Sequence, residues 1–251
     1  MTKSGSRVQR WISSPRSHRH NQTISLQNTE TTWAIVPIKD FARAKSRLGT
    51  VLTSAQCTAL ARHMADDVIA ALHASGLVEG ITLLGTGADT GAFAAARGCA
   101  FLPDIAGGLS VNLARAAAQL AGNGVAKALI LPTDLPMVTA SDIDTLLAQH
   151  ADGLTVCRAA RDGGTNALVV SPPDAIAFRF GTHSATRHMG EGRAANLRCR
   201  LIAGGPFSRD VDRPDDLLWF CRQHPPGYTT DYLDRSGIRA QLLDDDAVMT
   251  A

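Results

Sequence analysis

The sequence ALILPTDLP at residues 128–136 carries the strongest indication of the fold. Its first four residues form an uninterrupted apolar run between Lys127 and a proline, a pattern typical of a strand buried on both faces of a parallel sheet. Asp134 follows, held between two prolines that fix the local backbone. In open α/β sheets ligands bind beyond the carboxyl ends of the strands, so this carboxylate is well sited for a metal ion. A helix cap or a turn explains an Asp here equally well.

Strands alternate with helices on both sides of this stretch. The segments predicted as strands are 32–36, 81–84, 100–102 and 128–131, and the segments predicted as helices are 55–74, 89–96, 109–120 and 141–149. Such alternation implies right-handed βαβ crossovers and a mostly parallel sheet. Past Gly153, strands at 154–158 and 166–170 around the turn RDGG predict an antiparallel addition. A helix at 184–195, a last strand at 198–202 and a helix at 215–222 complete the predicted α/β fold.

Length and charge set further limits. The 251 residues fit one sizeable α/β domain, and no apolar run reaches the ~18 residues that a bilayer span requires. The net charge is +2, but residues 1–30 hold five Lys or Arg against one Glu, so the remainder is slightly acidic. We expect a disordered basic leader at 1–30, one folded domain at 31–224 and a loosely attached acidic tail at 225–251.

The cysteines and the leader indicate the compartment. Five cysteines, widely spread and without a Cys-x-x-Cys pair, argue against a disulfide framework and against a zinc site. The leader has no apolar core after its basic residues, so it does not read as a secretory signal. We expect a reduced, cytoplasmic protein with neither a nucleic-acid nor a membrane partner.

A loop rich in cations follows the first predicted strand, with Lys39, Arg43, Lys45 and Arg47 inside nine residues. A cationic loop at the carboxyl end of such a strand can hold a nucleoside triphosphate. It lacks the glycine patterns of P-loops and of dinucleotide sites. A solvated basic face is the simpler interpretation and is favoured for this loop taken alone.

Two further carboxylates, Asp210 and Asp212, alternate on an extended segment and therefore share one side of the chain. If the last predicted strand lies near the strand that ends at Asp134, the three carboxylates converge. They would repel one another without a cation between them, and Mg²⁺ prefers such oxygen ligands together with phosphate oxygens. Alternatively, Asp210 and Asp212 pair with the neighbouring arginines or cap the next helix.

Two glycine-containing segments, DGGTN at 162–166 and FGTHS at 180–184, are further candidates. Glycines let the backbone approach a ligand, and hydroxyls with exposed N–H groups can hold a phosphate or a carboxylate. A plain hairpin turn explains the first segment equally well. His183 and His188 lack a third ligand for a metal, so packing or surface roles are favoured for them.

Together these motifs resemble the 2-phospho-L-lactate guanylyltransferase family, whose members make the phosphate-linked side chain of the deazaflavin coenzyme F-420. The motifs run in the family's order over about residues 33–222. They are PIK at 37–39 with AKSRL at 44–48, PTDLP at 132–136, GGTNAL at 163–168, Phe180 and Gly181 with Ser184 and His188, and DVDRPDDL at 210–217.

The resemblance implies a Rossmann-like fold of the nucleotide-diphosphosugar-transferase type. It also implies Mg²⁺-dependent transfer of GMP from GTP to a phosphorylated three-carbon acid, with release of pyrophosphate. The acid would be 2-phospho-L-lactate, phosphoenolpyruvate or 3-phospho-D-glycerate, and the sequence does not choose among them. The implied roles are metal binding for Asp134, Asp210 and Asp212, nucleotide binding for Lys45, Arg47, Asp104, Gly108 and Asp134, acid binding for Lys39, Thr165, Gly181 and Ser184, and catalysis for Lys45 and Asp134.

One departure and several alternatives accompany the resemblance. Ser110 stands where the family commonly has Asn, so contacts to the base are not carried over. Another nucleotidyltransferase of the same fold, such as a molybdopterin guanylyltransferase or a cytidylyltransferase, is disfavoured by the Lys-rich first loop. A non-catalytic GTP-binding module is disfavoured by the three acids. A homodimer is the default expectation for the oligomeric state.

Overall fold

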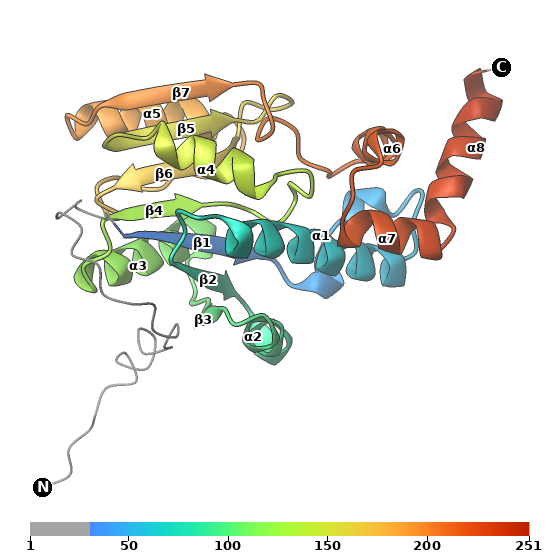
Figure 1. Cartoon of the computed structure of the whole chain (residues 1–251), viewed down its shortest axis with the longest axis horizontal. Helices are drawn as coiled ribbons and strands as arrows, with labels where there is room; N and C mark the ends of the chain where they lie inside the picture. The colour runs from blue at the N-terminus through green and yellow to red at the C-terminus, as the bar shows by residue number, and fades with distance from the viewer. Residues whose placement is uncertain (1–30, 251) are drawn as a thin grey trace, which may run out of the picture. The chain divides into compact units, whose positions relative to one another are not determined.

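The computed structural model describes residues 31–250, and the predicted leader lies outside the described residues. The described chain forms a seven-stranded sheet in the order β3-β2-β1-β4-β6-β5-β7 (Figure 1). Neighbouring strands are parallel except where β6 pairs with β4 and with β5. The strands are β1 Thr32–Ile38, β2 Gly80–Gly85, β3 Ala100–Pro103, β4 Lys127–Ile130, β5 Gly153–Arg158, β6 Thr165–Ser171 and β7 Cys199–Ala203.

This sheet confirms the prediction of a mostly parallel α/β fold with an antiparallel addition. β4 lies at its centre, and Ala128, Leu129 and Ile130 are completely buried. A strand covered on both faces needs no polar alternation, which is why its apolar run could be read directly from the sequence.

Helices cover both faces of the sheet. α1 and α4 lie over one face and α3 lies behind the other (Figure 1). No helix of the described residues 31–250 has the length and apolar character to cross a membrane. The helices are α1 Ser54–Ala74, α2 Gly87–Ala96, α3 Gly108–Gly122, α4 Ala140–Ala148, α5 Ser184–Ala194, α6 Pro214–Gln223, α7 Tyr228–Arg235 and α8 Ile238–Thr250, with short 3₁₀ turns at Phe41–Arg43 and Ser46–Leu48.

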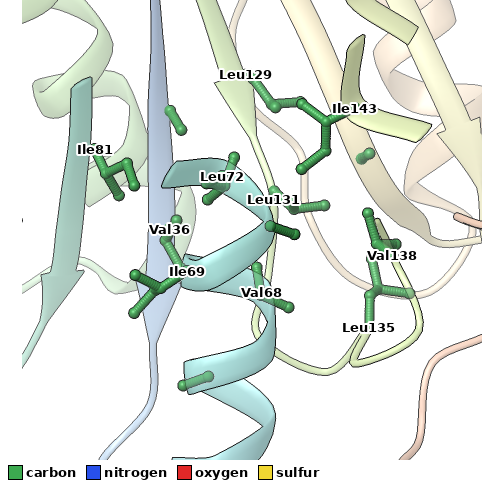
Figure 2. Close-up of a cluster of buried hydrophobic side chains, with 14 of the residues drawn as sticks. Val36, Val68, Ile69, Leu72, Ile81, Leu129, Leu131, Leu135, Val138 and Ile143 are labelled. Carbon is green, nitrogen blue, oxygen red and sulfur yellow. The ribbon is translucent and has the colours of Figure 1, made fainter. Parts of the chain in front are cut away.

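α1 shows how sequence and packing agree in this fold. Its N-terminus is a capping box, in which Thr53 Oγ1 accepts from Gln56 N and Gln56 Oε1 accepts from Thr53 N. Val68, Ile69 and Leu72 on one face of the helix pack against the central strands (Figure 2). Each such side chain contributes about 1.5–3 kcal/mol on burial.

The C-terminal segment differs from the expected loosely attached acidic tail. Leu233 of α7 and Ile238 and Leu242 of α8 are buried, and they pack in a cluster with Phe220 of α6. Asp67 of α1 accepts the first backbone N–H groups of α7, at 2.7 and 3.0 Å. The expectation of a loose tail from residue 225 is therefore wrong, because apolar side chains at helical spacing among the acidic residues bury one face of each helix.

The route by which the chain reaches β4 also differs from the expectation. β7 lies at the edge of the sheet, separated from β4 by β6 and β5, so the last strand is not near the strand that precedes Asp134. Instead, the segment after β7 returns to the centre, where Val211 N donates to the Asp134 carbonyl oxygen at 2.9 Å. A backbone contact beyond the strands brings the two segments together.

Candidate active site

A cavity of about 700 Å³ lies at the carboxyl ends of β1 and β4 and beside the amino end of β6. It brings together loops that are far apart in the sequence, which is the usual place for a ligand in this type of sheet. Among the residues predicted for the site, Arg47 is outside the lining, and those that line it are Lys39, Lys45, Asp104, Gly108, Asp134, Thr165, Gly181, Ser184, Asp210 and Asp212.

The three predicted metal ligands converge. One carboxylate oxygen from each of Asp134, Asp210 and Asp212 lies within 4.8 Å of the other two. Asp134 Oδ1 is buried and has no hydrogen-bond partner. Such an oxygen costs free energy unless a donor or a cation satisfies it.

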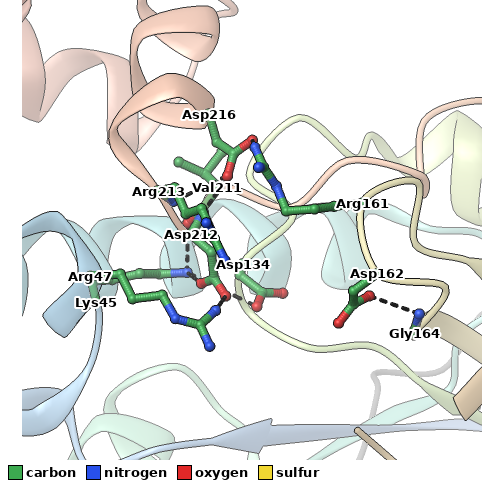
Figure 3. Close-up of polar contacts among 10 residues, drawn as sticks. All are labelled: Lys45, Arg47, Asp134, Arg161, Asp162, Gly164, Val211, Asp212, Arg213 and Asp216. Atoms are coloured by element: carbon green, nitrogen blue, oxygen red, sulfur yellow. Dashed lines mark hydrogen bonds and ion pairs between the residues drawn. The ribbon is translucent and has the colours of Figure 1, made fainter. Parts of the chain in front are cut away.

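Lys45 lies against this cluster. Its Nζ donates to the Val211 carbonyl at 2.7 Å and to Asp212 Oδ1 at 2.8 Å, and it is 4.0 Å from Asp134 Oδ2 (Figure 3). Its side chain is only 8% exposed, so the interpretation of the whole loop as a solvated basic face is wrong at this residue. Lys45 also adopts a left-handed backbone conformation, φ 56°, a strain that functional sites often hold.

The remaining cations of the loop are less engaged. The side chain of Arg47 is two-thirds exposed, and its guanidinium lies 3.6 Å from Asp212 Oδ2. Arg43 is almost fully exposed beside Asp40. Lys39 is exposed at the cavity wall. These exposed cations have few contacts to give up if the phosphates of a ligand approach them.

The charges set the protonation of the acids. Burial raises the pKa of Asp134, and the nearby charge of Lys45 opposes that shift. Burial also raises the pKa of Asp210, and the carboxylate of Asp134 adds to it. At Asp212 burial acts in the same direction, but Lys45 and the other cations outweigh it and hold the pKa below its ordinary value. The ionised forms of Asp134 and Asp210 are therefore disfavoured in free energy near neutral pH, and a divalent cation bound beside them would offset this.

Asp216, which was given no role from the sequence, anchors the acid-bearing segment. It is 2% exposed, and its Oδ2 accepts from Arg213 N at 3.1 Å and Asp212 N at 3.4 Å. Its Oδ1 accepts from Arg161 at 2.8 Å, which ties the glycine turn to the same segment (Figure 3). The signal that could have found it is an Asp at the third position of a helix opened by proline.

Arg209 lies 3.7 Å from Asp216 Oδ1 and stacks on Trp219. The alternative in which Asp210 and Asp212 pair with the neighbouring arginines is therefore wrong for Asp212, whose cations are Lys45 and Arg47.

The two glycine-containing segments meet at the far wall of the cavity. Gly163 and Gly181 have positive φ values, 68° and 120°, that favour glycine. The N-terminus of α5 docks on the turn, since Ala185 N donates to the Gly163 carbonyl at 3.2 Å. Thr165 and Ser184, both buried, are thereby brought into hydrogen-bond contact at 2.9 Å.

Two further side chains, Asn166 and Ser110, contribute to this part of the cavity. Asn166 lines the cavity and is 7% exposed, and its Nδ2 has no hydrogen-bond partner. Asn166 belongs to the motif GGTNAL, but the sequence alone predicts no function for it. Ser110, at the position where the family commonly has Asn, accepts from Phe180 N at 3.2 Å and so links α3 to the loop that carries Gly181.

The site combines the elements that phosphate chemistry requires. Three carboxylates around a buried, unpartnered oxygen fit a hard divalent cation, because such ions take oxygen ligands. Lysine and arginine stand beside them, and hydroxyl and amide donors line the opposite wall. The fold and the site define the class of protein: it is an α/β nucleotidyltransferase.

Comparison with known proteins identifies the family. The model of the guanylyl transferase CofC-like family matches residues 32–247, and the chain belongs to that family. A phosphoenolpyruvate guanylyltransferase from Roseiflexus sp. (strain RS-1) is 39% identical over 216 residues, covering 83% of this chain and 94% of the relative. A 3-phospho-D-glycerate guanylyltransferase from Phenylobacterium zucineum (strain HLK1) is 32% identical over 194 residues, covering 75% and 89%.

The fold has a solved counterpart as well. A structure from Desulfovibrio desulfuricans G20, assigned provisionally as a nucleotide-diphospho-sugar transferase, superposes with a TM-score of 0.70 and covers 84% of this chain and 97% of that one. Its sequence identity is 20%, so it supports the fold and not a substrate. The expected nucleotide-diphosphosugar-transferase-type fold is thereby confirmed.

Proposed function

We propose that this protein transfers GMP from GTP to the phosphate of a phosphorylated three-carbon acid and releases pyrophosphate. The observation that carries the proposal is the convergence of Asp134, Asp210 and Asp212 beside Lys45 in one cavity. The family match and the names of the relatives support the guanylyl group and the class of acid. The product would serve the synthesis of the deazaflavin coenzyme F-420.

The carboxylate side of the cavity suits the nucleotide. Asp134, Asp210 and Asp212 would hold Mg²⁺, and the buried Asp134 Oδ1 gives that ion an oxygen with no competing partner. Bound there, Mg²⁺ would offset the negative charge of the triphosphate and of the leaving pyrophosphate. Lys45 and Arg47 would contact the phosphates by releasing some of their contacts to Asp212. Asp104 and Gly108 would contact the nucleoside, since both line the cavity where β3 leads into α3.

The opposite wall suits the acid. It offers hydrogen-bond donors, namely the hydroxyls of Thr165 and Ser184, the backbone at Gly181 and the unpartnered Asn166 Nδ2. The Lys39 ammonium, whose charge acts on Asp134 and Asp212, would contact the acid from the carboxylate side. Carboxylate and phosphate oxygens only accept hydrogen bonds, so a wall of donors matches a phosphorylated carboxylic acid. Phosphoenolpyruvate is the first acid to test, because the 39%-identical relative is named for it.

No general base is required for this reaction. The attacking group is a phosphate oxygen that is already anionic, so the chain needs to align it with the α-phosphorus and to stabilise the charge of the leaving group. Alignment of two bound reactants can supply a large part of the rate enhancement. Fixed positive charge near the transferring phosphoryl group supplies much of the rest.

The deciding experiment measures pyrophosphate release with Mg²⁺ and each of GTP, ATP, CTP and UTP against phosphoenolpyruvate, 2-phospho-L-lactate and 3-phospho-D-glycerate. The product, in which a P–O–P bond joins GMP to the phosphate of the acid, is drawn off by the next enzyme of the pathway. We expect release with GTP and one acid, and its loss in Asp210→Asn. Folded protein that releases no pyrophosphate in any pairing would overturn the proposal and favour a GTP-binding module.

A further inference from the structure

A buried histidine lies directly behind the two hydroxyls of the acid-binding wall. His188 of α5 is fully buried, and its Nδ1 lies 2.9 Å from Thr165 Oγ1. Its other ring nitrogen, Nε2, accepts the backbone N–H of Arg179 at 2.8 Å. From the sequence alone, a packing or surface role is favoured for this residue.

The Arg179 contact decides which ring nitrogen carries the proton. A backbone N–H can only donate, so Nε2 must be the unprotonated nitrogen of a neutral imidazole. The proton is then on Nδ1, which donates to Thr165 Oγ1. Burial, together with the charge of Arg187, lowers the pKa of His188 to about 4, which keeps the ring neutral at physiological pH; Glu191 opposes this only weakly.

The direction of that hydrogen bond fixes how many protons the hydroxyl pair can offer. Thr165 and Ser184 have one hydroxyl proton each, and one of the two is used in the 2.9 Å bond between them. Because His188 donates to the pair, the second proton is left over. If Nδ1 accepted instead, both protons would be consumed within the triad. Both hydroxyl residues line the cavity, so the spare proton is available to a ligand.

We propose that His188 is a positioning residue that, as the Nδ1–H tautomer held by Arg179 N–H, orients the Thr165–Ser184 hydroxyl pair to donate a hydrogen bond to an oxyanion of the acid substrate. The inference rests on the proposed function only for the identity of that ligand. The ring also packs edge-on against Phe180, with centroids 4.8 Å apart, so its orientation is fixed from two sides. His188 touches no reacting atom and acts through Thr165.

The first test does not depend on the function. Nitrogen-15 correlation spectra of the histidine rings in the full chain, without substrates at pH 7, report the tautomer of each neutral ring. The chain has eight histidines, so His188 is assigned by the signal that His188→Asn removes. We expect a neutral ring protonated at Nδ1. A ring protonated at Nε2, or a charged ring, would overturn the inference whether or not the protein is a guanylyltransferase.

The second test uses two variants of nearly equal size. His188→Asn can place an amide N–H where Nδ1 stands, whereas His188→Leu cannot donate, and both lose the acceptor for Arg179 N–H. We expect His188→Leu to raise KM for the acid roughly three- to tenfold, as the loss of one oriented hydrogen bond predicts. His188→Asn should raise it clearly less, and KM for GTP should stay the same in both.

A double-variant cycle separates positioning from a purely structural role. In a Thr165→Val background the Asn and Leu variants at position 188 should have equal KM values for the acid, because the hydroxyl through which they act is gone. Equal KM values in the Thr165 background, or a difference that persists with valine, would refute the inference. If no pairing of nucleotide and acid supports turnover, the proposed function fails. The same variants are then compared by their dissociation constants for the acid alone, in place of KM.

Discussion

Replacing Lys45 with methionine should destabilise the metal-free protein near neutral pH. The ammonium makes one charge-assisted hydrogen bond to Asp212 and one to the Val211 carbonyl, and it lies 4.0 Å from Asp134. A hydrogen bond to a charged group contributes about 1.5–3 kcal/mol, and breaking a fully buried pair costs about 3–5 kcal/mol. Because Asp134 and Asp212 are 28% and 30% exposed, we expect a loss of about 2–3 kcal/mol.

The loss should depend on pH in a defined direction. Lys45 helps to hold the pKa of Asp212 below its ordinary value, so this contribution is present above about pH 4 and disappears as pH falls through the depressed pKa. Lys45 also opposes the raised pKa values of Asp134 and Asp210. Without it these acids take up protons at higher pH, which relieves their repulsion. The part of the difference that comes from Asp134 and Asp210 should therefore shrink as pH falls from 7 to 4, and the part that comes from Asp212 should disappear below about pH 4.

The assay is urea unfolding followed by tryptophan fluorescence, in EDTA, at several pH values. For a domain of this size the loss corresponds to a fall in Tm of about 4–12 °C at pH 7. Lys39→Met is the matched control, because Lys39 is exposed at the same cavity and should change stability by less than about 0.5 kcal/mol. Equal stability of Lys45→Met and wild type at pH 7, or a deficit unchanged at pH 4, would refute the reasoning.

Three further variants test the site and the core. Asp210→Asn should lower turnover at least about a hundredfold, measured as pyrophosphate release, since an interaction with the transferring phosphoryl group contributes several kcal/mol. In EDTA the same variant should be slightly more stable than wild type at pH 7, because the raised pKa of Asp210 means that its ionised form costs stability as pH rises through it. Asn166→Leu should raise KM for the acid about tenfold and leave KM for GTP unchanged. It should not lower the free energy of unfolding, since the buried Nδ2 has no partner to lose. A loss above about 1 kcal/mol in urea unfolding would show instead that the amide has a partner within the protein. Leu72→Ala, at a fully buried position of α1, should cost about 2–5 kcal/mol in the same unfolding assay with little change in KM.

Much of the fold could be predicted because local signals and tertiary packing agree. The run 128–131 is apolar on both faces because β4 is the central strand, and the capping box of Thr53 and Gln56 marks the start of α1. The C-terminal segment was mispredicted for the opposite reason. Its apolar residues Leu233, Ile238 and Leu242 are sparse among acidic ones, and their spacing acquires meaning only against the surface of α6.

For the candidate site as well, one part could be predicted from the sequence and another part could not. The residue types and their order along the chain are properties of the sequence, and they were enough to select the acids, the lysine loop and the glycine turns. The distances between these residues cannot be read from the sequence. Asp210 and Asp212 reach Asp134 through a crossing segment pinned by Val211 N–H and by Asp216, although β7 itself lies at the far edge of the sheet.

The kinds of chemistry that this chain can perform follow from its amino-acid sequence, because side-chain charge and hydrogen-bonding capacity depend on residue type. Which side chains share an environment follows from the tertiary structure. Burial leaves Asp134 Oδ1 and Asn166 Nδ2 without partners, and it places His188 where a backbone N–H selects its tautomer. Those properties depend on desolvation and on contacts between distant segments, which no local pattern encodes.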